Sequence, residues 1–167
     1  MGLSEYNLHA LSMHFTAEDI VIVAPLYWGL GHATRDIPII YWLKANCKKV
    51  IIASDGAALD LLKREFPDLK IEHLPSYNIR YRFKNIIVNI LIGWYSILKA
   101  VITENNVARS LTNKYNASII LSDNRLGFYN PQIKSLYMTH QINILHNRPW
   151  ISWLGTRLHQ AFIKKFN

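Results

Sequence analysis

Short apolar runs rich in valine and isoleucine recur along this chain, and they constrain the fold more than any other feature of the sequence. They cover residues 19–26, 48–54, 69–75, 117–124 and 134–141. The strongest of them are nearly continuous, which is typical of strands buried on both faces of a parallel sheet. Helix-length segments separate them. The alternation predicts a doubly wound, mainly parallel α/β sheet with Rossmann-like topology.

Helical patterns fill the intervals between the runs. Residues 33–47 are expected to form a helix, with Pro38 falling early enough to be tolerated in the first turn. Its apolar stripe comprises Ile37, Ile40, Tyr41 and Leu43. A second helix is predicted over residues 55–67, and a basic, aromatic one over residues 149–167.

The most apolar segment, residues 86–102, is also expected to be helical, with a polar continuation over residues 103–116. A helix that spans a membrane needs about 20 apolar residues. This segment is shorter and contains Asn89 and Lys99. We therefore predict a helix that packs on the sheet or lies on a membrane surface.

The bulk composition favours one domain. The 167 residues are 50% hydrophobic, so residues 18–167 can form a single domain with its own core, and residues 1–17 are expected to be an N-terminal extension. Cys47 is the only cysteine, which fits a reducing cytoplasm. The net charge of +8 suits anionic partners, but no nucleic-acid-binding motif is present, so nucleic acid is not the expected partner. No histidine or cysteine spacing suggests a metal site.

A glycine-rich turn follows the first apolar run. Gly29, Gly31 and His32 stand between a strand and a helix, where free backbone amides and the positive end of the helix dipole suit phosphate. Thr34 occupies the place of the third glycine of the dinucleotide fingerprint. Asp55, after the second run, can imitate the ribose-binding acid, so a nicotinamide-binding domain stays open as an alternative.

Polar residues also follow the fourth and fifth runs, and parallel strands bring their carboxyl ends to one edge of the sheet. Asp123 ends the fourth run, and its carboxylate can hold the imidazole of His32 in one tautomer. The alternatives are a surface histidine and an Asx turn formed with Asn124. Further candidate contacts at this edge are Asn124, Arg125, His140 and Gln141.

Basic and aromatic residues gather around the two most apolar helical segments. Such residues suit the interface of an anionic membrane, although an ordinary core face with solvated charges has the same composition. The candidate membrane-surface residues are Arg80, Arg82, Lys84, Trp94, Trp150 and Trp153.

Four segments in order carry a family resemblance: "VAPLYWGLGHATRDIPII", "FPDLKIEHLPSYNIRY", "IILSDNRLGFY" and "LYMTHQ". They resemble the N-terminal half of a bacterial MurG-like glycosyltransferase with the two-domain GT-B fold. The resemblance implies one GT-B half-domain that binds the glycosyl acceptor, which can be lipid-linked. It also implies that a C-terminal domain binds most of a nucleotide-sugar co-substrate, and that neither a metal nor another cofactor is required.

The resemblance further implies residue roles. His32 would be the catalytic base that takes the proton of the acceptor hydroxyl, and Asp123 would support it. The acceptor would contact Gly29, Gly31, Thr34, Asn124, Arg125, His140 and Gln141. The donor-binding half is not in this sequence, so we expect either a piece of a longer hexosyltransferase or the non-catalytic, membrane-associated acceptor subunit of a split transferase. Either would be cytoplasmic, peripheral on the inner face of the membrane, and inactive as this chain alone.

Overall fold

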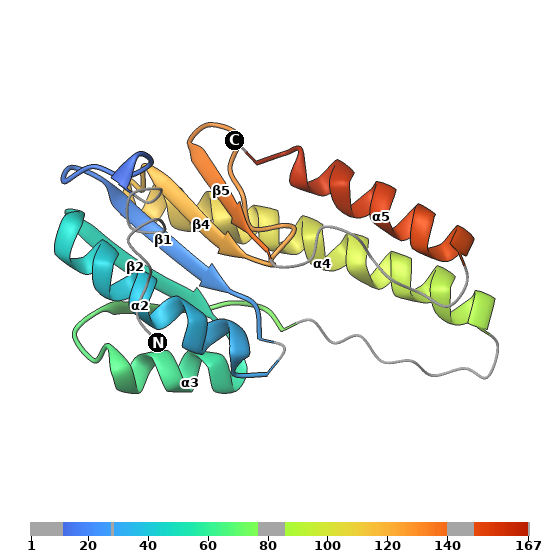
Figure 1. Cartoon of the computed structure of the whole chain (residues 1–167), viewed down its shortest axis with the longest axis horizontal. Coiled ribbons are helices and arrows are strands. Elements are labelled where there is room, and N and C mark those ends of the chain that lie inside the picture. The colour runs from blue at the N-terminus through green and yellow to red at the C-terminus, as the bar shows by residue number, and fades with distance from the viewer. Residues whose placement is uncertain (1–11, 28, 77–85, 140–148, 167) are drawn as a thin grey trace.

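The computed structural model describes residues 12–27, 29–76, 86–139 and 149–166 (Figure 1). Five strands form one parallel sheet, with bounds β1 Ile20–Pro25, β2 Lys49–Ser54, β3 Lys70–His73, β4 Ile119–Asp123 and β5 Lys134–Met138. All five lie within the predicted runs. The predicted parallel α/β sheet is therefore confirmed.

Four helices connect or follow the strands: α2 Gly31–Asn46, α3 Gly56–Glu65, α4 Ile86–Tyr115 and α5 Pro149–Ile163. The apolar segment and its polar continuation form the single helix α4, as expected. Within the described part of the chain, no helix combines the length and the apolar character needed to cross a membrane.

The strand order is β3-β2-β1-β4-β5. The chain therefore builds the sheet outward from β1 in one direction and then returns to add β4 on the other side of β1. This reversal makes the gap between the carboxyl ends of β1 and β4 a topological switch point, where ligands bind in open α/β sheets.

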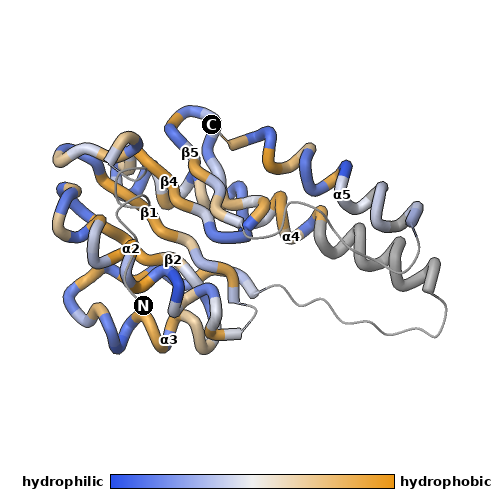
Figure 2. Tube along the Cα trace, viewed as in Figure 1, coloured by the Kyte–Doolittle hydropathy of each residue, from blue (hydrophilic) through white to orange (hydrophobic). Residues whose placement is uncertain are grey.

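Helices cover both faces of the sheet, which explains why the strand sequences are continuous rather than alternating. Val21 and Val23 of β1 pack with α2 and α3 on one face, while Ile22 and Ala24 pack with α4 on the other. Figure 1 shows α2 and α3 together on one side and α4 on the other, and Figure 2 shows the apolar strands between them. Tyr137 of β5 anchors α5 through a hydrogen bond to His159 at 3.2 Å.

Two local expectations were wrong. Pro38 lies inside α2, well past its first turn. Tyr41 is not a core residue, because it is 49% exposed and its hydroxyl donates to Glu65. Phe15, which belongs to the expected N-terminal extension, is buried and its ring contacts that of Trp42.

Candidate functional site

The site lies at the switch point. Pro25, the last residue of β1, pairs with Asp123, the last residue of β4. The Leu26 amide donates to the Asp123 carbonyl at 2.9 Å, and the chain then turns through Gly29 to begin α2 at Gly31. Gly29 has a φ of +82°, a conformation that residues with a side chain rarely adopt. The turn therefore delivers the first residues of α2 directly over the end of β4.

His32 and Asp123 meet in this position. The Nδ1 atom of His32 lies 2.8 Å from Oδ2 of Asp123, whose carboxylate is fully buried, while the imidazole remains 11% exposed. An ionised Asp123 accepts the Nδ1 hydrogen and leaves Nε2 as the basic nitrogen. The structure thus brings together the two residues that sequence reasoning paired across 91 positions.

Arg35 completes the cluster, and sequence reasoning missed it. Its Nη2 atom donates to Oδ1 of Asp123 and lies 3.3 Å from Nδ1 of His32. Arg35 follows His32 by three residues, which places both side chains on one face of α2. That three-residue spacing is the sequence feature from which the role of Arg35 could have been predicted. The guanidinium and the imidazole together occupy both oxygens of Asp123 and hold its carboxylate in place.

Asp36 lies beside this cluster, but its carboxyl group, unlike that of Asp123, has no basic partner in the described part of the chain. It is fully buried, and neither of its carboxyl oxygens has a hydrogen-bond partner among the described residues. Burial raises the pKa of Asp36 well above its usual range, and the negative charge of Asp123 raises it further. Both causes favour the neutral form of the Asp36 carboxyl group.

The prediction that Arg125 contacts the acceptor is wrong. Its side chain is fully buried, so it cannot touch an acceptor. The guanidinium donates to the Pro25 carbonyl at 3.0 Å, to Glu104 at 2.5 Å and to Asp55. These contacts join β1, α4 and the start of α3. Arg125 therefore holds the switch-point edge together from within.

The same network removes the support for a nicotinamide-binding site. The Asp55 carboxylate is buried and committed to Arg125, so it is not available to a ribose hydroxyl. Thr34 also departs from the fingerprint, because its hydroxyl donates back to the carbonyls of Leu30 and Gly31 at 3.0 and 3.1 Å.

The remaining candidates fall into two groups. Asn124 lies at the site in a left-handed conformation, with a φ of +58°, and accepts a hydrogen bond from Tyr137 at 3.3 Å. His140, Gln141, Arg80, Arg82 and Lys84 lie outside the described residues, as does the side chain of Trp94.

In the ranges that the structure describes, no three His, Cys, Asp or Glu side chains converge as a metal site requires.

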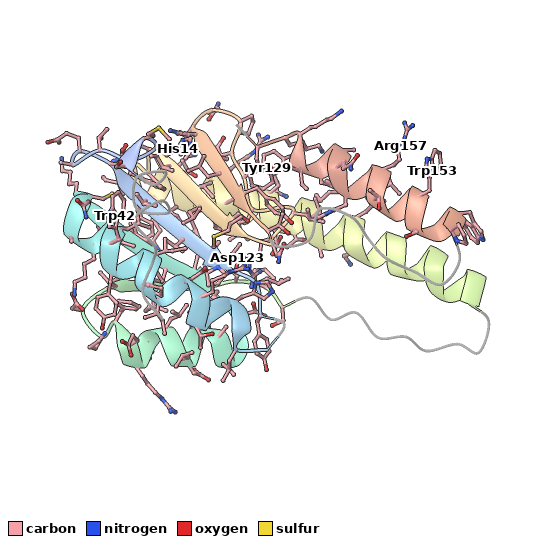
Figure 3. The ribbon with its side chains drawn as sticks, in the orientation of Figure 1. His14, Trp42, Asp123, Tyr129, Trp153 and Arg157 are labelled. Atoms are coloured by element: carbon pink, nitrogen blue, oxygen red, sulfur yellow. The ribbon has the colours of Figure 1, made fainter. Side chains whose placement is uncertain are left out.

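Trp150 and Trp153 lie on α5, away from the switch point. They are 53% and 61% exposed, and Arg157 stacks on Trp153 with its guanidinium carbon 5.1 Å from the ring centre. Figure 3 shows Trp153 and Arg157 pointing outward from α5, at a distance from Asp123. The two tryptophans therefore belong to a separate surface rather than to the His32 cluster.

The parallel sheet, its switch point and the helices on both faces define a Rossmann-like half of the GT-B fold. Solved structures with similar folds include CalG4, the calicheamicin glycosyltransferase, with a TM-score of 0.57 and 10% identity over 86% of this chain. The glycosyltransferase of kitacinnamycin has a TM-score of 0.54 at 12% identity over 86% of this chain. A putative UDP-N-acetylglucosamine 2-epimerase from Listeria monocytogenes gives 0.53 at 11% identity over 88%.

These similarities are similarities of fold. The chain spans 37%, 35% and 38% of the lengths of those three structures, respectively. No protein-family model matches the sequence, and no curated protein matches it significantly.

Proposed function

We propose that this domain binds the acceptor in a MurG-like glycosyltransferase, which moves a sugar from a nucleotide-sugar donor to an acceptor hydroxyl. The observation that carries the proposal is the hydrogen bond between Nδ1 of His32 and the Asp123 carboxylate at the switch point. The fold neighbours support it, because two of the three are glycosyltransferases. A second domain would bind most of the donor and form the other wall of the cleft.

His32 performs the proton transfer in this mechanism. Nε2 takes the hydrogen of the acceptor hydroxyl as its oxygen forms a bond to the anomeric carbon of the donor sugar. The bond from that carbon to the donor phosphate breaks, and the nucleoside diphosphate leaves with the electron pair. Asp123 stabilises the imidazolium that results, and Arg35 keeps the Asp123 carboxylate aligned.

The turn before α2 provides the acceptor contacts. Leu30, at the N-cap position, makes no side-chain cap, and the first turn of α2 contains no acidic residue of its own, so the helix itself supplies no side-chain acceptor for the amides of that turn. Gly29 and Gly31 have open space where a Cβ would stand, which lets a ligand approach the backbone. Asn124 faces the same edge, whereas Arg125 and Thr34 act on the protein's own backbone.

Replacing His32 with alanine tests the proposal in the complete gene product. We expect the transfer rate, measured with a panel of nucleotide sugars and acceptors, to fall by about 10²–10⁴-fold, because the general base is lost. His73→Ala is the matched control, since His73 is exposed at the end of β3. Full activity of the His32→Ala protein would exclude His32 as the base.

The exposed tryptophans of α5 favour a second candidate function, peripheral binding to an anionic membrane on its cytoplasmic face. Tryptophan rings beside arginine suit the boundary between headgroups and acyl chains. Trp150 and Trp153 supply the rings, and Arg157 lies directly over one of them. A lipid-linked acceptor would reach the switch point from such a surface.

Cosedimentation with vesicles of anionic phospholipid tests this candidate. We expect the double variant Trp150→Ser with Trp153→Ser to bind at least about tenfold more weakly, because it loses the two rings that enter the interface. Tyr41→Ser is the control, since it removes another exposed aromatic side chain from a different helix. Equal vesicle binding by the double variant and the parent chain would refute the candidate.

A further inference from the structure

Tyr27 lies at the carboxyl edge of the sheet, between the end of β1 and the turn that leads to His32. It is 38% exposed, although the preceding residue, Leu26, is buried. Its hydroxyl makes no hydrogen bond to another residue that the structure describes. An aromatic ring with a free polar tip is therefore presented at the same edge as the proposed catalytic base.

The first residue of α3 forms a seat for this ring. A Cβ added at Gly56 would overlap the Cδ1 and Cε1 atoms of Tyr27, so the ring rests directly on the Gly56 backbone. Gly56 also has a φ of +54°, a conformation that residues with a side chain rarely adopt. Two separate features thus require glycine at this position, and one of them is the close approach of the Tyr27 ring.

Buried hydrogen bonds fix the backbone on both sides of this seat. The Pro25 carbonyl accepts hydrogen bonds from Ser54 Oγ at 2.8 Å and from Arg125 Nε at 3.0 Å. Another nitrogen of the Arg125 guanidinium donates to Asp55, the N-cap residue of α3. Arg125 therefore ties the end of β1 to the start of α3. An exposed Tyr27 on a rigid, buried support is preorganised in the way that a binding residue requires.

The position of Tyr27 relative to His32 follows from the strand order. Gly56 lies just beyond the end of β2, Asp123 ends β4, and β1 lies between these two strands. Neighbouring strands are about 4.8 Å apart, so the ends of β2 and β4 are about 10 Å apart. Helices α2 and α3, which begin at these ends, cover the same face of the sheet (Figure 1). This span suits one sugar ring that lies on Tyr27 and directs a hydroxyl group toward Nε2 of His32.

The chemistry of a phenol ring matches that of a sugar ring. The faces of an aromatic ring carry partial negative charge, and the C–H groups on one face of a pyranose are apolar and weakly positive. Stacking these two faces removes apolar surface from water. The Tyr27 hydroxyl can in addition donate a hydrogen bond to a sugar hydroxyl or accept one from it.

We propose that Tyr27 is a specificity-determining residue of the acceptor site, and that its ring stacks on a pyranose ring of the acceptor. The acceptor would then be a saccharide or a glycoconjugate rather than a ligand held by charge alone. The word acceptor rests on the proposed transfer reaction. The stacking does not, because it requires neither turnover nor a donor domain.

Titration of the 167-residue chain with methyl pyranosides, followed by NMR, tests the stacking directly. The panel contains the methyl glycosides of glucose, galactose, mannose and N-acetylglucosamine. We expect saturable shifts at Tyr27 and at residues 29–35 with at least one of them. Tyr27→Phe should bind within about threefold of the parent chain, because it keeps the ring, whereas Tyr27→Ala should bind about tenfold more weakly. Tyr41→Ala is the matched control, since Tyr41 is an exposed tyrosine further along α2.

Kinetics of the complete gene product supply the second measurement. Tyr27→Ala should raise the acceptor KM about tenfold and leave kcat within about threefold, whereas loss of the base in His32→Ala lowers kcat. If His32→Ala were fully active while sugar binding still depended on Tyr27, the base assignment would fail and the stacking site would stand. No saturable binding of any pyranoside, or equal binding by the Tyr27→Ala and Tyr41→Ala chains, would overturn the proposal.

Discussion

Replacing Arg125 with methionine is expected to lower the free energy of unfolding by about 3–5 kcal/mol, the usual cost of breaking a buried ion pair. The change leaves the carboxylates of Asp55 and Glu104 buried without their common cation. It also leaves the Pro25 carbonyl without its side-chain donor. Small domains are stable by only about 5–15 kcal/mol, so this loss would remove a substantial part of the total stability.

Denaturant unfolding followed by circular dichroism measures this effect. Arg109→Met is the control, because Arg109 is an exposed arginine of α4 whose guanidinium donates to the neighbouring Asn105. Adding Asp55→Asn and Glu104→Gln to Arg125→Met should restore part of the lost stability, because the two stranded charges are then removed. A loss no larger than that of Arg109→Met would show that the buried network contributes little to stability.

The strands could be predicted from the sequence because burial on both faces leaves a continuous apolar run. β1, β2 and β4 have this pattern, and each lies within its predicted run. The edge strand β3 has no buried residue, and its signal was correspondingly weaker. The predicted site edge followed from the same logic, since parallel strands collect their carboxyl ends. The predicted contact between His32 and Asp123 follows from this arrangement, and the two side chains are hydrogen-bonded.

The charge states within the site could not be predicted in this way. Arg125 follows a strand end just as a ligand-binding residue would, and only the packing of α3 and α4 shows that two carboxylates enclose it. The burial of Asp36 could not be predicted, because a polar residue in a helix is ordinarily solvated. In this structure Asp36 faces the core. Both depend on contacts between elements far apart in the chain, which periodicity does not encode.

Replacing Asp123 with asparagine is expected to reduce the proposed sugar transfer by about 10³–10⁴-fold while leaving the fold intact. An amide can present its NH₂ group to Nδ1 of His32, which then favours the tautomer that carries its hydrogen on Nε2. That tautomer cannot accept the proton of the acceptor hydroxyl. Arg35 would also lose its anionic partner, so the cluster would no longer hold the imidazole firmly.

Two NMR measurements separate this electrostatic effect from simple misfolding. Nitrogen chemical shifts of the His32 ring should show the hydrogen moving from Nδ1 to Nε2. The pKa of the Asp36 carboxyl should fall, because the charge of Asp123 is one of the causes that raise it. Asp60→Asn, on the exposed side of α3, should change neither property. An unchanged tautomer together with full transfer activity would mean that Asp123 supports the structure of the switch point and not its chemistry.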